Sequence, residues 1–144
     1  MQLLALSDLH LAHPENRALV EALSPHPDDW LVLAGDLGEK TAHLEWAFRA
    51  LGPKFARLIW VPGNHELWTT RARAGGEAAV GLAKYEQLVA LCRRYGALTP
   101  EDPYPRWNGE GGAHVIAPVF LLYDYSFRPD DVPLGGEVAW AEET

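Results

Sequence analysis

Three short apolar runs, each followed directly by polar residues, constrain the fold of this chain more than any other feature. The runs cover residues 2–7, 30–34 and 57–61, and each has the length of one buried strand. Helical patterns separate the runs, and the clearest covers residues 41–51, where apolar side chains recur at every third or fourth position. Continuous apolar strands that alternate with helices predict a parallel sheet covered by helices, which is an α/β fold.

The remaining segments show weaker patterns. Pro14 marks the start of a first helix, and residues 80–95 predict a further helix with an apolar stripe that begins at Leu82. Residues 104–107 and 114–123 are typical of a hairpin or meander. The final stretch is rich in Pro, Gly and acidic residues, and it shows no evident terminating element.

Composition narrows the class of protein. The chain has 144 residues, of which 48% are hydrophobic, so it is long and apolar enough for one folded domain. The net charge is −8 without a block of Lys or Arg, which argues against a nucleic-acid-binding surface but leaves phosphate esters open as substrates. The single cysteine, Cys92, is interpreted as a buried apolar side chain. No apolar run approaches bilayer length, so we expect a cytoplasmic protein without a membrane partner.

Each apolar run ends in side chains that can bind a metal ion. The first leads into Asp8 and His10, the second into Asp36, and the third into Asn64, His65 and Glu66. Because the carboxyl ends of parallel strands meet at one edge of a sheet, we expect these side chains to gather there. Oxygen and nitrogen donors without a thiolate favour Mn, Fe, Zn, Ni or Mg.

Each residue also has an ordinary structural interpretation. Asp8 and Asp36 are common turn or cap residues, and Asn64 is one of the few residues that tolerate a left-handed backbone. Taken together, in this order and each after a buried strand, they favour a metal site. Gly35 and Gly63 would then allow the backbone to turn sharply beside the ligands.

The sequences D-x-H at residues 8–10, G-D at 35–36 and G-N-H-E at 63–66 resemble the first three motifs of the calcineurin-like metallophosphoesterase family. The resemblance covers residues 1–70 and implies a metallo-dependent phosphatase-like four-layer αββα sandwich. The later motifs of that family, a further histidine and Gly-His-x-His, have no counterpart, since only His114 follows the third motif. We therefore expect residues 1–144 to be a single domain that supplies roughly the N-terminal half of the sandwich and is truncated at its C-terminal end.

The resemblance also implies roles for the motif residues. Asp8 and His10 would bind a first metal ion, Asp36 would bridge two ions, and Asn64 would bind the second. His65 would not bind metal, but would face the phosphate and help to protonate the leaving oxygen.

Two acidic residues are candidates for supporting positions behind these groups, namely Glu39 and Glu66. In the protein-phosphatase branch of the family an acid at the position of Glu39 orients the catalytic histidine, and an Arg follows it. Here Lys40 follows instead, which argues against a protein Ser/Thr phosphatase. An acid near a helix N-terminus is an equally good interpretation of Glu39.

The function that the resemblance implies is two-metal hydrolysis of a phosphate mono- or diester, and the chain also resembles family members proposed to act on phosphopantetheinyl carrier proteins. Arg71, Arg73, Arg93 and Arg94 are the candidates for contact with such an acidic carrier. The alternative is a catalytically impaired scaffold or binding module of the same fold. We expect the 144 residues alone to be weakly active or inactive. Their uncovered sheet face is expected to self-associate or to meet a missing C-terminal segment.

Overall fold

The computed structural model describes residues 1–68, 79–121 and 128–143. Strands and helices alternate along the first part of the chain, as the sequence predicts, and a short hairpin follows the last long helix. In chain order the elements are β1 (Leu3–Leu6), α1 (Pro14–Ala22), β2 (His26–Ala34), α2 (Thr41–Leu51), the 3₁₀ helix η1 (Gly52–Lys54), β3 (Phe55–Val61), α3 (Asn64–Leu67), α4 (Gly81–Arg94), β4 (Arg106–Trp107), β5 (His114–Val115) and α5 (Glu137–Glu143).

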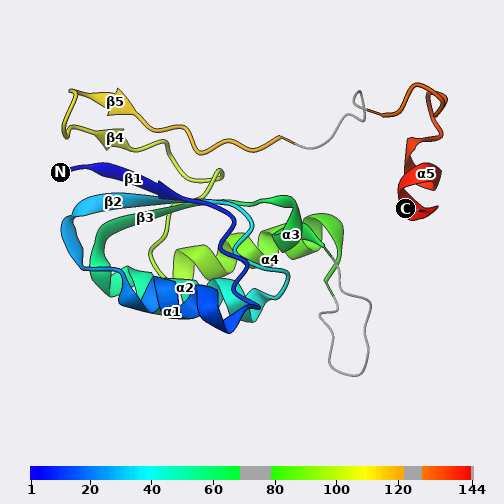
Figure 1. The fold of residues 1–144 in the computed structure, drawn as a ribbon. Coiled ribbons are helices and arrows are strands. Elements are labelled where there is room, and N and C mark those ends of the chain that lie inside the picture. Colours follow the sequence, from blue (N-terminus) through cyan, green and yellow to red (C-terminus); the bar gives the residue numbers. More distant parts are fainter. Residues whose placement is uncertain (69–78, 122–127, 144) are drawn as a thin grey trace.

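Strands β1, β2 and β3 form a parallel sheet in that order (Figure 1). Leu3 of β1 pairs with Trp30 of β2, and the same register continues to the ends of both strands. Leu98 adds a further parallel bridge to Ile59 of β3. Because all these strands run in one direction, their carboxyl ends lie at one edge of the sheet.

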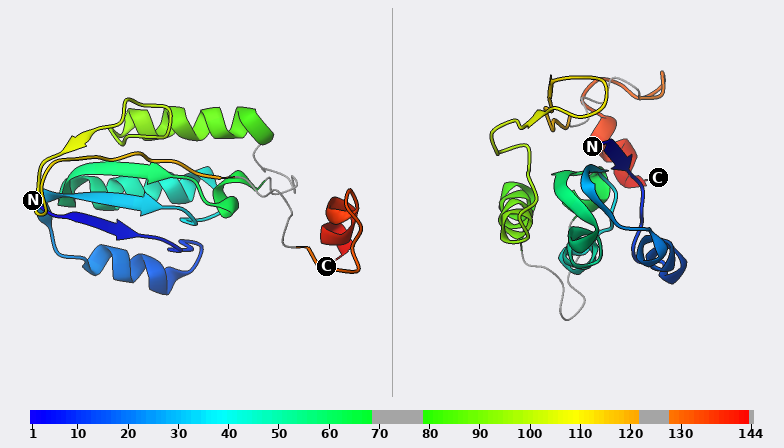
Figure 2. Two further views of the ribbon diagram at one scale, coloured as in Figure 1. Left: turned by 90° about the horizontal axis from the view of Figure 1, so that it is seen from above. Right: turned by 90° about the vertical axis from the view of Figure 1, so that its left-hand side faces the viewer.

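Helices α1, α2 and α4 cover one face of this sheet (Figure 2). Alternate strand residues point toward them, so that Leu31 and Leu33 of β2 and Trp60 of β3 are fully buried. Each such side chain contributes on the order of 1.5–3 kcal/mol of transfer free energy. The buried core on this face comprises Leu11, Val20, Leu31, Leu33, Leu37, Leu44, Ala47, Phe48, Leu51, Phe55, Leu58, Trp60, Leu88, Val89, Leu91, Cys92 and Ala97.

The opposite face is covered in part. Trp30 and Ile59 are buried there against Trp107 of β4, in a second and smaller core. The antiparallel β4–β5 hairpin lies on this side of the sheet (Figure 1). Toward the carboxyl edge of the same face, Ala5 and Ala34 are exposed. The sequence predicts one uncovered sheet face. Among the described residues, this face is uncovered only near its carboxyl edge.

Several elements differ from the sequence prediction. β2 begins at His26, earlier than predicted, because the His26 ring stacks on Phe55 and the two residues pair across the strands. The strand predicted at 114–123 is limited to β5, and residues 122–127 lie outside the described residues. α5 forms where no element was predicted. In α4, Leu82 is exposed, and Lys84 is buried in its place.

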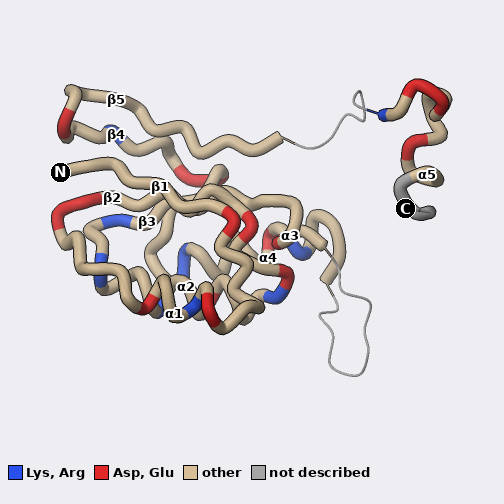
Figure 3. The backbone as a smooth tube through the Cα atoms, in the orientation of Figure 1, with Lys and Arg blue, Asp and Glu red and all other residues tan. Residues whose placement is uncertain are grey.

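The charged residues are unevenly placed along the sheet. Figure 3 shows Lys and Arg spread over separate elements, whereas acidic positions occur together where β1 and β2 end. That edge is where the motif residues follow the strands. Within the described ranges, no helix has both the length and the apolar character needed to cross a bilayer.

Candidate metal centre

The loops that follow the three strands are joined to one another by hydrogen bonds. The backbone N–H of Asp8 donates to the carbonyl of Gly35 at 3.1 Å, and that of His10 donates to the carbonyl of Asp36 at 3.0 Å. The loop after β3 joins them, because the N–H of His65 donates to Asp36 Oδ1 at 3.1 Å. The strand ends predicted to form one site are therefore one connected unit.

The backbone at these strand ends adopts an uncommon conformation. Among the described residues, the non-glycine residues with positive φ are Asp8 (56°), His10 (41°) and Asp36 (56°). A left-handed conformation costs on the order of 1–3 kcal/mol for a residue with a side chain and occurs most often at functional sites. All three residues are predicted metal ligands, so the strained backbone conformation coincides with the predicted metal-binding positions.

Two glycines let these loops approach each other closely. Gly35 has φ of 88°, and a Cβ on it would lie 2.7 Å from the backbone nitrogen of Gly63. Gly63 has an ordinary φ of −92°, so the expectation that glycine is needed there for a sharp backbone turn is wrong. Glycine is needed at this position because a Cβ would overlap Oδ1 of Asp36. Both glycines therefore hold the loop after β2 against the loop after β3.

Glu66 connects the same two loops through its side chain. It is 2% exposed, and its carboxylate accepts hydrogen bonds from the backbone N–H groups of Asp36 (3.1 Å), Leu37 (2.6 Å) and Gly63 (2.9 Å). The bond from Gly63 also caps the short helix α3. Burial raises the pKa of the Glu66 carboxyl, and the three N–H donors oppose that shift. Glu66 thus holds the backbone of Asp36 next to that of Gly63.

Three side chains converge in front of this support. One ligand atom each from His10, Asp36 and His65 lies within 4.8 Å of the others, and the two imidazole rings meet edge to face at 4.7 Å. Asp8 is exposed and does not belong to this group within the described residues. Asn64 is half-buried at the first position of α3. His65, which is predicted to be a proton donor, thus lies beside two of the predicted ligands, His10 and Asp36.

Two side chains hold the imidazole of His65. Its Nδ1 lies 3.0 Å from Oε1 of Glu39, and its ring lies 3.9 Å from that of Trp68, measured between centroids. A hydrogen bond from its own backbone N–H, and next the contact with His65, hold the pKa of the Glu39 carboxyl below its usual value. Glu39 therefore contacts the imidazole, as its histidine-orienting interpretation requires.

The geometry at the strand ends can be compared with known families. A sequence model described as calcineurin-like phosphoesterase matches residues 1–129. The chain belongs to this family. The resemblance carried by the three motifs is confirmed, and so is the α/β fold class with its parallel sheet.

One relative, PptH of Mycobacterium tuberculosis, is similar to this chain in both sequence and structure. This chain is 48% identical over 141 residues to the acyl-carrier-protein phosphodiesterase PptH of Mycobacterium tuberculosis, covering 96% of this chain and 43% of that protein. The crystal structure of phosphopantetheinyl hydrolase PptH from the same organism matches with a TM-score of 0.86 and 47% identity, over 99% of this chain and 51% of that one. The chain thus spans about half the length of the relative that it matches.

The donor set fits the divalent metal ions that calcineurin-like phosphoesterases use. An imidazole nitrogen from His10 and a carboxylate from Asp36 approach each other from separate strand ends, and the His65 imidazole lies beside them. Such a mixed nitrogen and oxygen set suits borderline and hard divalent ions. Backbone strain at Asp36 and His10 presents these donors on one side of the loops.

Sequence reasoning missed one residue of this region, the buried Lys84. Lys84 of α4 is 1% exposed, and its Nζ donates to the carbonyl of Glu39 at 3.1 Å and to the carbonyl of Trp68. A lysine four residues before Leu88, in the buried register of an amphipathic helix, is the signal that could have found it. The Trp68 ring packs against the His65 ring rather than lying free in its loop.

The other histidines lie away from this cluster. His114 stacks on Trp107 in the β4–β5 hairpin, at the opposite end of the sheet. His13 and His26 lie near Glu15 and Asp29, and neither joins the cluster. His43 is buried in α2, with Nδ1 4.0 Å from the Glu39 carboxylate.

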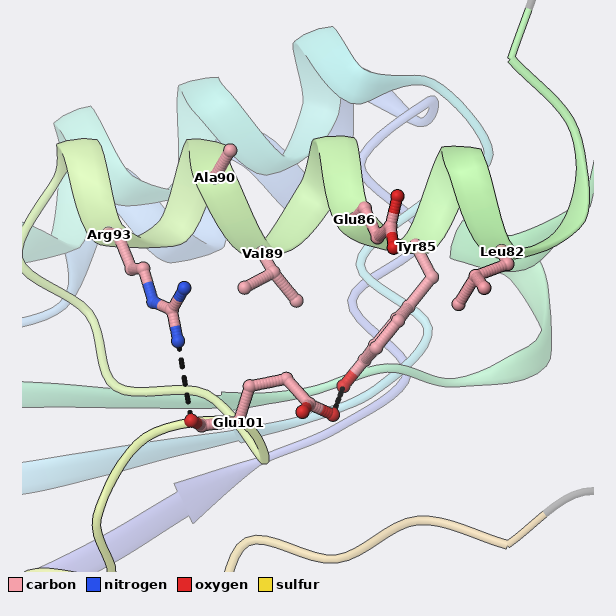
Figure 4. Close-up of a pocket in the computed structure, with 7 residues that line it drawn as sticks. All are labelled: Leu82, Tyr85, Glu86, Val89, Ala90, Arg93 and Glu101. Atoms are coloured by element: carbon pink, nitrogen blue, oxygen red, sulfur yellow. Dashed lines mark hydrogen bonds between the residues drawn. The ribbon is translucent and has the colours of Figure 1, made fainter.

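A cavity of about 610 Å³ lies along α4, apart from the His10, Asp36 and His65 side-chain cluster (Figure 4). Leu82, Val89 and Arg93 line it, together with Tyr85 and Glu101, whose side chains are hydrogen-bonded to each other at 2.9 Å. None of the clustered histidines or acids contributes to its walls. The cavity and the cluster are therefore separate features of the described chain.

Proposed function

We propose that this chain carries the metal-binding edge of a phosphoesterase that hydrolyses a phosphate diester on a phosphopantetheinyl carrier protein, with two divalent metal ions. The observation that carries the proposal is the setting of His65, whose Nδ1 is held by Glu39 while the ring lies beside the carboxylate of Asp36. A fixed imidazole next to metal-binding groups is suited to donate a proton to a phosphate ester held there.

The predicted ligands divide between two ions. Asp8 and His10 would hold one, Asn64 would hold the other, and Asp36 would contact both. When bound, divalent ions neutralise the phosphate charge and activate water for in-line displacement. The chain contributes the placement, since Glu66 fixes the backbone of Asp36 through a hydrogen bond of 3.1 Å.

His65 has a separate role in this proposal. Its Nδ1–H donates to Glu39, which leaves Nε2 to carry a proton toward the substrate. As the P–O bond breaks, Nε2 gives that proton to the leaving oxygen, and the product departs as a neutral alcohol. An alkyl ester needs this donor because an alkoxide is a poor leaving group.

The carrier-protein substrate is supported by the relative PptH, which is named an acyl-carrier-protein phosphodiesterase and a phosphopantetheinyl hydrolase. Direct support from charge is weaker. Arg71 and Arg73 lie outside the described residues, and Arg93 is paired with Asp102 at 2.9 Å. An acidic carrier would therefore meet few unpaired cations along α4.

The test uses the gene product that carries residues 1–144, with added Mn²⁺, and compares wild type with His65→Ala. The substrates are a phosphopantetheinylated carrier protein, followed by mass spectrometry, and bis-nitrophenyl phosphate. We expect His65→Ala to lower turnover of the carrier by about 10²–10⁴-fold. The loss should be smaller for the nitrophenyl ester, because nitrophenolate leaves without a proton.

Metal analysis of the same variants separates the alternatives. Retained metal in His65→Ala supports a proton donor, and lost metal would make His65 a ligand. His114→Ala is the matched control and should change neither quantity. A wild-type protein that binds no metal and turns over neither ester would favour the scaffold alternative.

The partly covered sheet face is proposed to meet a further protein surface, either a second copy or another segment of the gene product. The exposed Ala5 and Ala34 near the carboxyl edge support this, since their neighbours on that face are apolar. Sedimentation of residues 1–144 as a compact monomer would contradict self-association.

A further inference from the structure

Lys84 is a buried cation that no step of the proposed reaction uses. It lies on α4, in register with the buried Leu88 and Cys92, and it is 1% exposed. Placing an ammonium group there removes it from water, which is costly unless the group is paired with polar partners. The contacts of the ammonium group therefore indicate why a lysine occupies this buried position.

Two of its partners are backbone carbonyls from segments far apart in the sequence. Nζ donates to the carbonyl of Glu39 at 3.1 Å, and it also donates to the carbonyl of Trp68. Glu39 lies just before α2, and Trp68 directly follows α3. Lys84 thus joins three elements, α2, α3 and α4, at a single nitrogen.

The side chains of the two acceptor residues contact the same imidazole. Oε1 of Glu39 lies 3.0 Å from Nδ1 of His65, and the Trp68 ring lies 3.9 Å from the His65 ring. One contact fixes the ring edge, and the other lies against its face. A cation that fixes both backbones therefore fixes both restraints on His65.

We propose that Lys84 is a positioning residue for His65, acting through Glu39 and Trp68, an inference that rests on the proton-donor role given above. Without its ammonium group the two segments would separate, and His65 would lose its fixed orientation. A misplacement of about 1 Å can lower a catalysed rate by on the order of a hundredfold. Lys84 would thus matter for the chemical step without touching substrate.

A second lysine provides the matched control. Lys54 donates to the carbonyls of Val20 (3.1 Å), Glu21 (2.6 Å) and Leu23 (2.8 Å), at the end of α1. It joins backbone segments as Lys84 does, but none of its acceptors contacts His65. Lys54→Met therefore shows how the loss of a lysine that joins backbone segments affects the rate. Any additional loss in Lys84→Met is then due to the altered position of the His65 imidazole.

The experiment compares Lys84→Met and Lys54→Met in the gene product that carries residues 1–144. For Lys84→Met we expect kcat on the carrier diester to fall by about 10–100-fold with KM little changed. Turnover of the nitrophenyl ester should fall much less, because that leaving group needs no proton. Lys54→Met should leave both rates near wild type.

A spectroscopic measurement tests the proposal without activity. The proton on His65 Nδ1 is hydrogen-bonded to Glu39 and should therefore exchange slowly with water. We expect it to give an NMR signal downfield of the amide signals, which can be assigned by its loss in His65→Ala. We expect the signal to persist in Lys54→Met and to vanish in Lys84→Met. If wild type has the signal but no activity, the proposed function fails, and this comparison still decides the role of Lys84.

An unchanged signal together with unchanged kcat on the carrier diester in Lys84→Met would overturn the proposal. If Lys84→Met does not fold, Lys84→Gln replaces it, since the shorter neutral amide cannot reach both carbonyls. In that variant, loss of the signal supports the positioning role, and retention overturns it.

Discussion

The two ends of the parallel sheet are built on different principles. At the carboxyl end a positive φ occurs at Gly35 and also at three residues with side chains, the predicted ligands Asp8, His10 and Asp36. At the amino end, in the β4–β5 hairpin, it falls on Gly111 and Gly112, which adopt it without steric strain. One end keeps functional side chains in a costly conformation, and the other uses the residue that avoids the cost.

The carboxylates at the two ends show the same contrast. Asp29 accepts the backbone N–H of Gln2 at 2.6 Å and lies 3.1 Å from His26, and the hydrogen bond from Gln2 is the main reason that its pKa is lowered. Glu66 accepts three such N–H groups, but burial dominates and raises its pKa. Similar hydrogen bonds thus accompany opposite shifts, because desolvation is the largest influence on the pKa of Glu66 but is outweighed by the Gln2 hydrogen bond at Asp29.

The largest expected effect is at Asp36. Asp36→Asn keeps the size and tolerates the left-handed backbone, but it removes the charge that faces the metal ions. We expect metal content to fall and activity to drop by more than about a hundredfold, beyond the loss typical of supporting residues. Elemental analysis of the purified variant measures this. Metal content equal to wild type would contradict the bridging role, and Asp29→Asn at the amino end should retain metal.

Glu66→Gln tests whether the buried carboxylate supports the ligands. The amide keeps one acceptor oxygen and turns an NH₂ group toward backbone donors, so we expect a loss of about 2–3 kcal/mol in the free energy of unfolding. Metal affinity should also weaken by about 10–100-fold. Urea unfolding and metal titration measure the two effects. The control Glu110→Gln, whose exposed side chain contacts Gln2 at the amino end, should change neither.

Asp29→Asn should have a smaller effect that depends on pH. Because the folded pKa of Asp29 is lowered, its contribution to stability is present above the unfolded value of about 3.9 and is lost as pH falls through the folded value. Wild type should therefore be more stable than Asp29→Asn at pH 7, and the difference should vanish in strong acid. Urea midpoints across this range measure it. A difference that is independent of pH would refute the ionic origin.

His114→Ala should have the smallest effect. Its exposed ring stacks on Trp107 at 5.9 Å between centroids, and such a pair contributes about 0.5–1.5 kcal/mol at most. Thermal unfolding should show a small shift, and metal content should be unchanged. Loss of metal in this variant would mean that His114 replaces a missing ligand, and the division between the two ends would be wrong.

Much of the site could be predicted from local pattern. His10, Asp36 and His65 follow strands whose parallel direction the alternation of strands and helices already implies, so the grouping of these three side chains could be predicted. The left-handed φ at three of the ligands could not be predicted, because Asp and His adopt it only where surrounding contacts impose it.

The sequence by itself determined the α/β order, the motif residues at the strand ends and the family to which the chain belongs, because periods of 2 and 3.6 residues and short motifs are local properties. Only the tertiary structure decided that Glu66 bonds to Leu37 across 29 positions and that Lys84 bonds to Glu39 across 45. These contacts depend on how α2, α3 and α4 pack on the sheet. A buried charge is stable only where that packing supplies its partners.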